Sequence, residues 1–548
     1  MNLNNINNLK REKMKKAIYI IFLVLFILIS CNNNNKTSSN NEISISLGGE
    51  PKTLDPTLNS LSFGSIYMIH FFEGLTKKDK NDEVVAGMAK SWDISQDGLT
   101  YTFYLRDEAK WSDGEKVKAQ DFEYALKRAA EPKTAAAYSH MLNVVKNGSL
   151  VISGKTNVDA LGVKAIDDST LEIVLENPTP YFLEYLSVSS AYFPVRKDIV
   201  EKYGDDWSRN PETYIVNGAY VMTERKTDEK IVMEVNTNYY DKESIVAKKI
   251  NVIIMSDSNT SLAAIKRGDI QFSVIEAPLG EISSLIKENY ILQEPAYGIY
   301  FLEINSQKGV LTNKNIRKAL ALAFDRNYII SNITKMNQTP AYAFVAYGMK
   351  DSNGNDFREN GGNYLDLGSY SKNIKEAKRL MELSGYTNGE NFPVLEIRTT
   401  PGYFTLICEA MQEMYKENLG IDVTIKSEEY NETFQAMVEK NYDLARSGWT
   451  ADYSDPLAMI SFFSEVSAVN HSGFSSKEFN DLLKFASSTT NTEERTKALH
   501  KAEDLIFDSI PIIPIIYRMD PFMINPKLKG AIFNPLGRYR FHYAYLEK

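Results

Sequence analysis

The sequence predicts an α/β fold divided among two or three lobes. Short β-rich runs alternate with amphipathic helical segments over residues 298–447, which is the pattern of a sheet covered by helices. At 548 residues the chain is too long for one ordinary hydrophobic core. Its hydrophobic content of 43% and charged content of 24% are those of a soluble globular protein.

In the first half of the chain, strands are predicted where apolar and polar residues alternate, at residues 43–47 and 100–105. Residues 171–175 and 250–255 read as further strands. A helix is expected over residues 119–128. Because Lys118 offers no capping oxygen, Asp121 in the first turn should bond the free backbone amides there.

The second half continues the alternation. Residues 298–305 and 510–517 are long apolar runs, and prolines mark the second of them. Thr312 or Asn313 is expected to cap a helix with Ile316, Leu320 and Phe324 on one face. The remaining expected elements are a helix over 374–383 capped by Ser371, a helix over 406–419 ended by Gly420, and strands at 421–425 and 442–447.

The N-terminus predicts a targeting segment at residues 1–30. A basic stretch precedes the apolar run 17–29, which is too short to span a bilayer as a helix but suits a signal peptide. Leu28-Ile29-Ser30-Cys31 resembles a bacterial lipobox, so Cys31 is expected to carry lipid and to begin the mature chain. The alternative is an ordinary secretory signal with an incidental cysteine. Met14 could be the true start.

Composition excludes several classes of partner and site. The formal net charge is −9 and no basic block follows the N-terminus, so no nucleic-acid partner is expected. Residues 31–41 are polar and rich in asparagine, which predicts a flexible tether. After Cys31, Cys408 is the only thiol, and its apolar helical setting predicts a small core residue.

The stretch most suggestive of function follows the strand predicted at 442–447. It reads Gly448-Trp449-Thr450-Ala451-Asp452-Tyr453-Ser454-Asp455-Pro456, and Asp455-Pro456 has the chemistry of a turn. A carboxylate, Asp452, therefore lies between two aromatic residues near a strand end, where α/β proteins bind ligands. A loop aspartate with local hydrogen bonds explains the same pattern.

The Trp-x-Ala-Asp-Tyr motif resembles that of extracytoplasmic oligopeptide-binding lipoproteins, solute-binding proteins of family 5 that serve ABC peptide importers. The resemblance extends to Glu50-Pro51-x-x-Leu54-Asp55-Pro56, Phe72-Glu73-Gly74-Leu75 and residues 177–183, and it covers about residues 42–548. It implies that Asp452 holds the α-amino group of a peptide through a charge-assisted hydrogen bond. Because every peptide has that group, such an anchor does not depend on peptide sequence.

The resemblance also implies other peptide-binding positions. Trp449, with Gly448 and Thr450 beside it, would line the groove, although Trp449 could equally serve packing within its lobe. Tyr138 matches an aromatic of the peptide cleft, or is a core tyrosine. Arg446 matches an arginine that meets the C-terminal carboxylate of some peptides, or forms an ion pair at the strand end. Ser62 matches a position whose main chain pairs with peptide.

The fold implied by this resemblance is periplasmic-binding-protein-like (type II, cluster C). Two main lobes and an extra inserted domain are joined by a two-segment hinge, formed by the runs near 299–305 and 510–517. The expected divisions are lobe I at 42–75, 197–298 and 517–548, inserted lobe II at 76–196, and lobe III at 299–516.

No catalytic or metal motif competes with this interpretation. The five histidines form no His-Glu-x-x-His pair, and no nucleophile elbow, P-loop or dinucleotide fingerprint is present. Residues 351–356 only faintly resemble a calcium loop. We therefore expect no enzyme activity, no metal and no cofactor.

The expected protein is a monomer anchored by lipid at Cys31 on the bacterial membrane, facing the periplasm or cell exterior, that binds oligopeptides and delivers them to an ABC permease. A surface peptidase, a host-adhesion lipoprotein and a relative that binds dipeptides, nickel or haem stay open as alternatives.

Overall fold

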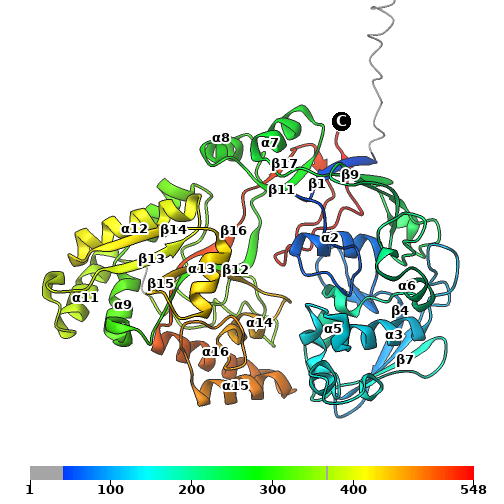
Figure 1. Ribbon diagram of the computed structural model, residues 1–548, viewed down its shortest axis with the longest axis horizontal. Coiled ribbons are helices and arrows are strands. Elements are labelled where there is room, and N and C mark those ends of the chain that lie inside the picture. Colours follow the sequence, from blue (N-terminus) through cyan, green and yellow to red (C-terminus); the bar gives the residue numbers. More distant parts are fainter. Residues whose placement is uncertain (1–40, 366–367) are drawn as a thin grey trace, which may run out of the picture. The chain divides into compact units, whose positions relative to one another are not determined.

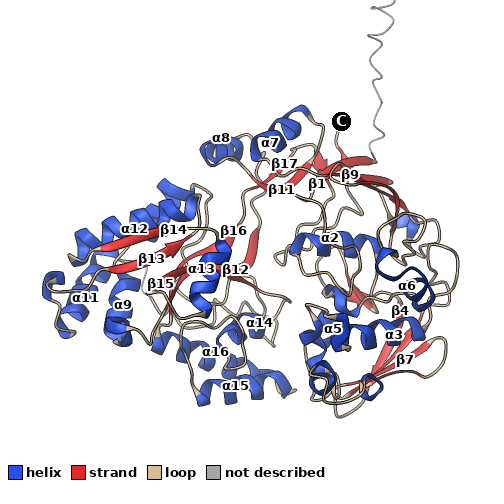
Figure 2. Cartoon of the chain, in the orientation of Figure 1, coloured by secondary structure: helices blue, strands red, loops and turns tan. Residues whose placement is uncertain are grey.

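The computed structural model describes residues 41–365 and 368–548, all of which belong to one compact unit (Figure 1). The predicted signal peptide, Cys31 and the predicted tether up to residue 40 lie outside the described residues. Three large sheets, each with helices packed against it, make up the unit (Figure 2). No helix in the described part combines the length and the hydropathy that a bilayer span requires.

The six-stranded sheet draws its strands from three distant stretches of the chain. β1 is parallel to β10 and β11, and its Ile43 and Ile45 are fully buried. The other pairs are antiparallel. The strand order is β17 (Phe522–Ile524), β11 (Phe272–Glu276), β1 (Glu42–Ser46), β10 (Lys249–Ile253), β9 (Lys230–Val235), β8 (Tyr220–Lys226). Helices α2 (Ser62–Phe71), α7 (Ser258–Arg267) and α8 (Ile282–Lys287) belong to the same stretches.

The four-stranded sheet is antiparallel and carries helix α3 (Ala119–Ala130). Its order is β4 (Ala89–Ile94), β5 (Thr100–Leu105), β7 (Thr170–Val174), β6 (Val163–Ala165). At the start of α3, the Asp121 carboxylate accepts the backbone N–H of Lys118 at 2.9 Å and the indole N–H of Trp111 at 3.0 Å. The predicted role of Asp121 at this helix end is confirmed.

The five-stranded sheet is of mixed direction, and a separate apolar cluster packs between its strands and helices. β13 is parallel to β14 and β15, while β12 is antiparallel to β15 and β16. The order is β14 (Val423–Ser427), β13 (Leu395–Thr399), β15 (Leu444–Thr450), β12 (Pro295–Ile304), β16 (Ile512–Met519). Helices α9 (Lys314–Leu322), α11 (Tyr370–Leu383) and α12 (Tyr403–Leu419) contribute to that cluster. Cys408 of α12 is buried in it, as predicted.

The remaining helices and strands complete the unit. They are β2 (Thr76–Lys78), β3 (Val84–Ala86), α4 (Gly148–Ile152), α5 (Phe182–Val188), α6 (Lys197–Tyr203), α10 (Arg326–Tyr328), α13 (Tyr430–Val438), α14 (Pro456–Ile460), α15 (Lys477–Ser488), α16 (Thr492–Ser509), β18 (Leu528–Lys529) and β19 (Tyr545–Leu546).

Two local predictions need correction. Ser371 does not cap α11; the helix begins at Tyr370, four residues before the predicted start at 374, and Ser369 is its N-cap residue. The strand predicted to end at residue 447 continues to Thr450, since pairing with β12 extends through Gly448, Trp449 and Thr450. Asn313 caps α9 as expected, and its side chain accepts the amide of Asn315 at 2.9 Å.

The chain passes twice between the five-stranded and six-stranded sheets. The first passage runs from β11 through α8 to β12, and the second runs from β16 directly to β17 (Figure 1). β12 and β16 are neighbours in the five-stranded sheet. The two apolar runs seen in the sequence are therefore adjacent strands, each continuous with one of the two connections.

Candidate functional site

The loop after β15 carries two aspartates with opposite surroundings. Asp455 accepts both terminal nitrogens of Arg495, each at 2.9 Å, and also the amide of Leu457 at 2.9 Å, which caps α14. Asp452 has no hydrogen bond or ion pair with another described residue. The alternative interpretation of Asp452, a loop aspartate held by local hydrogen bonds, thus applies to Asp455 and not to Asp452.

The Asp452 carboxylate is half-buried, and burial raises its pKa because the charged form loses hydration. The positive charge of Arg538, and that of His140 in its protonated form, act in the opposite direction. An ionised group without a hydrogen-bonding partner is costly to desolvate. A cationic ligand would supply the contacts that the chain itself does not.

Three distant parts of the sequence meet around Asp452. Tyr138 and His140 come from the start of the 3₁₀ helix Ser139–Val144, with their rings 5.6 Å apart, and Arg538 comes from the C-terminal segment. Burial raises the pKa of Tyr138, and the negative charge of Asp452 raises it further. Tyr138 also packs against the main apolar cluster. It therefore has contacts expected of a core tyrosine and also lies close enough to Asp452 to feel its charge.

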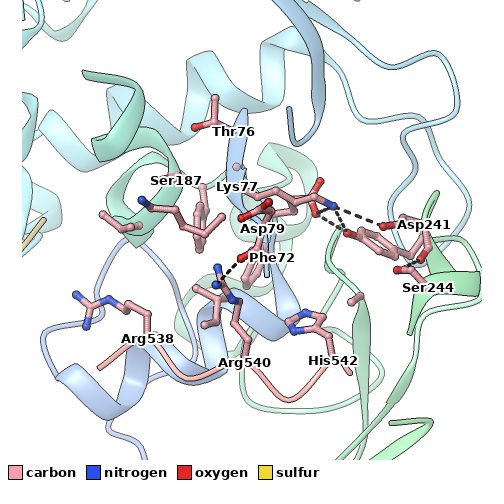
Figure 3. Close-up of a pocket in the computed structure, with 18 of the residues that line it drawn as sticks. Phe72, Thr76, Lys77, Asp79, Ser187, Asp241, Ser244, Arg538, Arg540 and His542 are labelled. Atoms are coloured by element: carbon pink, nitrogen blue, oxygen red, sulfur yellow. Dashed lines mark hydrogen bonds and ion pairs between the residues drawn. The ribbon is translucent and has the colours of Figure 1, made fainter. Parts of the chain in front are cut away.

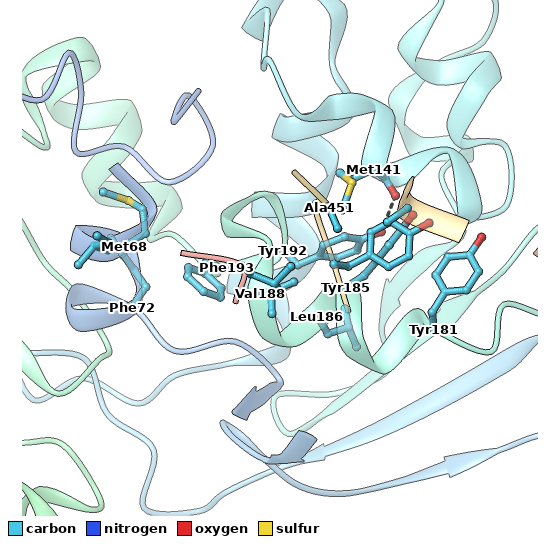
Figure 4. Packing of buried hydrophobic residues seen from close by; sticks show 14 of the residues in the cluster. Met68, Phe72, Met141, Tyr181, Tyr185, Leu186, Val188, Tyr192, Phe193 and Ala451 are labelled. Atoms are coloured by element: carbon cyan, nitrogen blue, oxygen red, sulfur yellow. Dashed lines mark hydrogen bonds between the residues drawn. The ribbon is translucent and has the colours of Figure 1, made fainter. Parts of the chain in front are cut away.

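Aromatic contacts hold the loop in place. The ring of Tyr453 stacks on Tyr181 with 5.1 Å between centroids and meets Tyr185 edge-on at 4.6 Å. Figure 4 shows Ala451 among the same cluster, near Tyr185 and Tyr192. Because residues on both sides of Asp452 are buried in this packing, the carboxylate has a defined position.

One edge of β15 is open along its second half. β12 pairs with β15 from Leu444 to Thr450, whereas β13 pairs with it only at Leu444 and Ala445. On the β13 side, residues 446–450 therefore have no strand partner within the described part of the chain. This open edge leads directly to Asp452.

Trp449 is fixed by its own sheet and the helix that follows. Its indole N–H donates to the carbonyl of Ala458 at 3.0 Å, and its ring meets Phe462 edge-on at 5.3 Å. The side chain remains half-buried. Packing within the lobe is thus observed, and the partly exposed indole lies on the open strand.

Gly448 and Thr450 flank Trp449 on the same strand. A side chain at Gly448 would place its Cβ 2.8 Å from the ring of Tyr300, so only glycine fits without a shift of that ring. Thr450 accepts a hydrogen bond from Arg518 of β16 at 2.8 Å.

Arg446 lines a pocket of about 440 Å³ at the far end of the open edge. Its guanidinium lies 4.0 Å from the ring centroid of Phe404 and forms no ion pair with a described residue. The ion pair weighed from the sequence is not found here. The pocket is also lined by Glu276, Tyr300, Tyr403, Tyr430, Gly448 and Arg518.

Ser62 begins helix α2, so its main chain lies in the first turn of a helix and not in a strand. The first-turn N–H groups of a helix have no partner within the helix. Arg538, His140 and Arg518 are neighbours of the site that the sequence did not single out. No motif surrounds them, and only the fold brings them near the loop.

Comparison with known proteins identifies the family. Residues 83–470 match the model described as bacterial extracellular solute-binding proteins, family 5 middle. The chain belongs to this family. It is a solute-binding protein and not an enzyme, and the α/β periplasmic-binding-protein fold with two main lobes is confirmed.

Among curated relatives, the family 5 chain is 33% identical to the oligopeptide-binding protein OppA of Bacillus subtilis, over 92% of each chain. It is 32% identical to the dipeptide-binding protein DppE of the same organism, over 96% of this chain and 98% of the relative. Among solved structures, Haemophilus influenzae OppA in complex with RPPGFSPFR aligns with a TM-score of 0.76 at 29% identity, over 93% and 99% of the two chains. The Escherichia coli murein tripeptide binding protein MppA aligns with a TM-score of 0.77 at 29% identity, over 92% and 98%.

Proposed function

We propose that this family 5 protein binds oligopeptides outside the cytoplasm and delivers them to the permease of an ABC importer. The observation that carries the proposal is the open edge of β15, which ends at an unpaired, half-buried carboxylate. The oligopeptide-binding and dipeptide-binding relatives support the same class of ligand.

The proposed binding mode is the addition of a peptide strand to residues 446–450. Main-chain hydrogen bonds to an open edge provide affinity that does not depend on peptide sequence. The peptide's α-ammonium meets Asp452, which sets the register through a charge-assisted hydrogen bond. Because Asp452 follows the C-terminal end of β15, the peptide runs antiparallel to this strand.

The other predicted positions take supporting roles in this proposal. Tyr138 faces the amino end of the peptide, and Trp449 offers a broad surface to its side chains. Arg446, about six residues before Asp452, lies where the carboxylate of a short peptide would arrive, given ~3.3 Å per residue in a strand. The main chain of Ser62 contacts the peptide from the opposite side.

Closure of the lobes around the peptide completes the proposed cycle. The two connections between the five-stranded and six-stranded sheets form the hinge, and the inserted lobe covers residues 76–196. The protein acts as a monomer held to the membrane by lipid at Cys31.

The test is calorimetry with peptides identified by mass spectrometry of the purified protein, each compared with its N-acetylated form. We expect Asp452→Asn to weaken binding of the free-amine peptide by about 2–5 kcal/mol, roughly 30-fold to several thousand-fold. Acetylation should weaken binding to the wild type and make little difference to the variant.

Asp481 provides the matched control, because it forms an exposed ion pair with Lys477. Asp481→Asn should bind as the wild type does. Equal affinity of the wild type for free and acetylated peptides would rule out Asp452 as the amino anchor.

A further inference from the structure

A second cavity, separate from the open edge of β15, lies beside the C-terminal segment and has a volume of about 130 Å³. Figure 3 shows Arg540 and His542 entering it from that segment, opposite Lys77 and Asp79. Arg538 also lines it, farther along the same wall. The cavity has room for several water molecules or one compact ion, since a water occupies ~30 Å³ in the liquid.

The basic side chains of the C-terminal segment have nitrogen atoms without partners. Arg540 is only 8% exposed; it donates to the carbonyl of Asp79 at 2.7 Å and to the carboxylate of Asp82 at 3.4 Å. Within the described residues, its buried Nε has no hydrogen-bond partner, nor does the buried Nδ1 of His542 or the buried Nε of Arg538.

Arg538 is the least compensated of these groups. Its side chain makes a long hydrogen bond of 3.4 Å to the carbonyl of Leu536, and no carboxylate of the described chain lies within ion-pair distance. Burial lowers the pKa of both Arg538 and Arg540, because a desolvated guanidinium is less favourable when charged.

The acidic groups of the cavity already have partners. Glu73 accepts the hydroxyl of Tyr240 at 2.7 Å and the ammonium of Lys77 at 3.2 Å. Asp79 accepts the backbone amides of Asn81 and Glu83 at 2.8 and 3.0 Å. Asp241, the third carboxylate of the lining, lies 3.8 Å from the ammonium of Lys77. The charged side chain of the lining that has neither an ion pair nor a close hydrogen bond in the described chain is therefore a cation, Arg538.

Lys78, another cation of the lining, is neutralised by Glu184 at 2.6 Å. The imidazole of His542 stacks on His70 at 4.6 Å, and burial holds the pKa of His542 well below its usual value. A neutral His542 can donate one N–H, and Arg540 has an unused donor beside it. Together they present the directed donors that an oxyanion requires.

We propose that this cavity binds a compact oxyanion, such as sulfate or inorganic phosphate, between Arg540 and His542 with Arg538 at its margin. Arg538 has no counterion within ion-pair distance, and Arg540 reaches one only through its 3.4 Å contact with Asp82. An oxyanion would offset the cost of burying these charges while filling the unpartnered donors. A guanidinium is suited to oxyanions because its planar donors match their geometry.

The first test is thermal denaturation of the mature chain in sulfate, phosphate or chloride at equal ionic strength. The wild type should show a saturable rise in Tm of about 2 °C in one or both oxyanions relative to chloride. Arg540→Met should abolish the saturable part, and Arg540→Lys should keep a fraction of it. Arg267→Met, at an exposed arginine paired with Asp269, is the control and should respond as the wild type does.

The second measurement is anomalous diffraction from crystals soaked in selenate, which also decides the matter if Arg540→Met does not fold. We expect a peak between Arg540 and His542. Equal, unsaturable stabilisation of the wild type and Arg540→Met would reflect general salt effects and overturn the proposal. A peak without saturable stabilisation would mean an adventitious ion only, and would overturn it too.

A consequence for ligand binding rests on the proposed peptide function. The charge of Arg538 acts on Asp452 and would repel a peptide ammonium there, so an oxyanion beside Arg538 should strengthen peptide binding. We expect about a fivefold gain in affinity in the oxyanion over chloride for the wild type, and none for Arg540→Met. The Tm and selenate measurements use no peptide, so failure of the peptide function would leave them unaffected. If selenate occupies the cavity but peptide affinity does not change, the proposed coupling between the two sites is refuted while the oxyanion site itself is not.

Discussion

Glu503, which pairs with Arg358, and Asp452 both carry a carboxylate that loses hydration in the fold, but the chain provides partners for only one of them. The side chains of Arg358 and Glu503 are both 0% exposed, and the carboxylate accepts Arg358 at 2.7 Å and the amides of Phe344 and Val345 at 3.0 and 2.9 Å. The chain itself therefore satisfies the buried charge. At Asp452 it supplies no such contacts. A carboxylate satisfied within the fold supports structure, whereas one left without partners is available to a ligand.

Glu303 of β12 is a third buried carboxyl group, and its surroundings differ from those of both Glu503 and Asp452. Its side chain is fully buried, accepts the amide of His471 at 2.7 Å, and has its second oxygen without a partner among the described residues. Burial raises its pKa to about 8, although the backbone amides of His471 and Ser472 and the charge of Lys440 oppose this. Glu303 is therefore protonated at neutral pH and avoids the cost of a buried charge.

Breaking the satisfied pair should have the largest effect. Arg358→Met leaves Glu503 buried without its cation, and we expect the free energy of unfolding to fall by about 3–5 kcal/mol. Urea denaturation of the variant and the wild type measures this. Arg379→Met, which removes an exposed partner of Glu376, is the control and should change stability by less than about 0.5 kcal/mol. Similar losses for both variants would contradict the contrast drawn here.

Glu303 should produce a pH dependence of stability. Because its pKa is higher in the folded chain than the ordinary glutamate value, its contribution is complete below about pH 4.5 and is lost as pH rises through about 8. Stability of the wild type should therefore fall between pH 5 and 9 more than that of Glu303→Gln, by roughly 2–4 kcal/mol. Urea titrations across this range provide the comparison. Parallel pH profiles of the two proteins would show that Glu303 is not protonated in the fold.

Asp452 should have the smallest effect on stability. Without peptide, Asp452→Asn removes a partly desolvated, unpaired carboxylate, so the free energy of unfolding should stay constant or rise by up to about 1 kcal/mol. Denaturation of the peptide-free variant tests this, beside the loss of affinity proposed above. A stability loss as large as that of Arg358→Met would mean that Asp452 has a structural partner.

Local sequence signals predicted much of the fold because they depend on neighbouring residues. Alternation at residues 100–105 predicted β5, and Asn313 and Gly420 mark the helix ends at which they were expected. The error at the end of β15 arose because a long-range partner decided the outcome. Pairing with β12 extends β15 to Thr450, three residues beyond the predicted end, and no pattern within residues 442–447 could have indicated this.

The candidate site divides in the same way. The motif around Trp449 and Asp452 is contiguous, so the sequence alone identified the family, the solute-binding class and the carboxylate of interest. Only the tertiary structure decided that Asp455 is satisfied while Asp452 is not, that residues 446–450 form an open edge, and that Arg538 and Tyr138 lie near the loop. The burial of a side chain and the presence of a partner for its charge depend on segments that lie hundreds of residues apart in the sequence. These segments come into contact only when the sheets pack together.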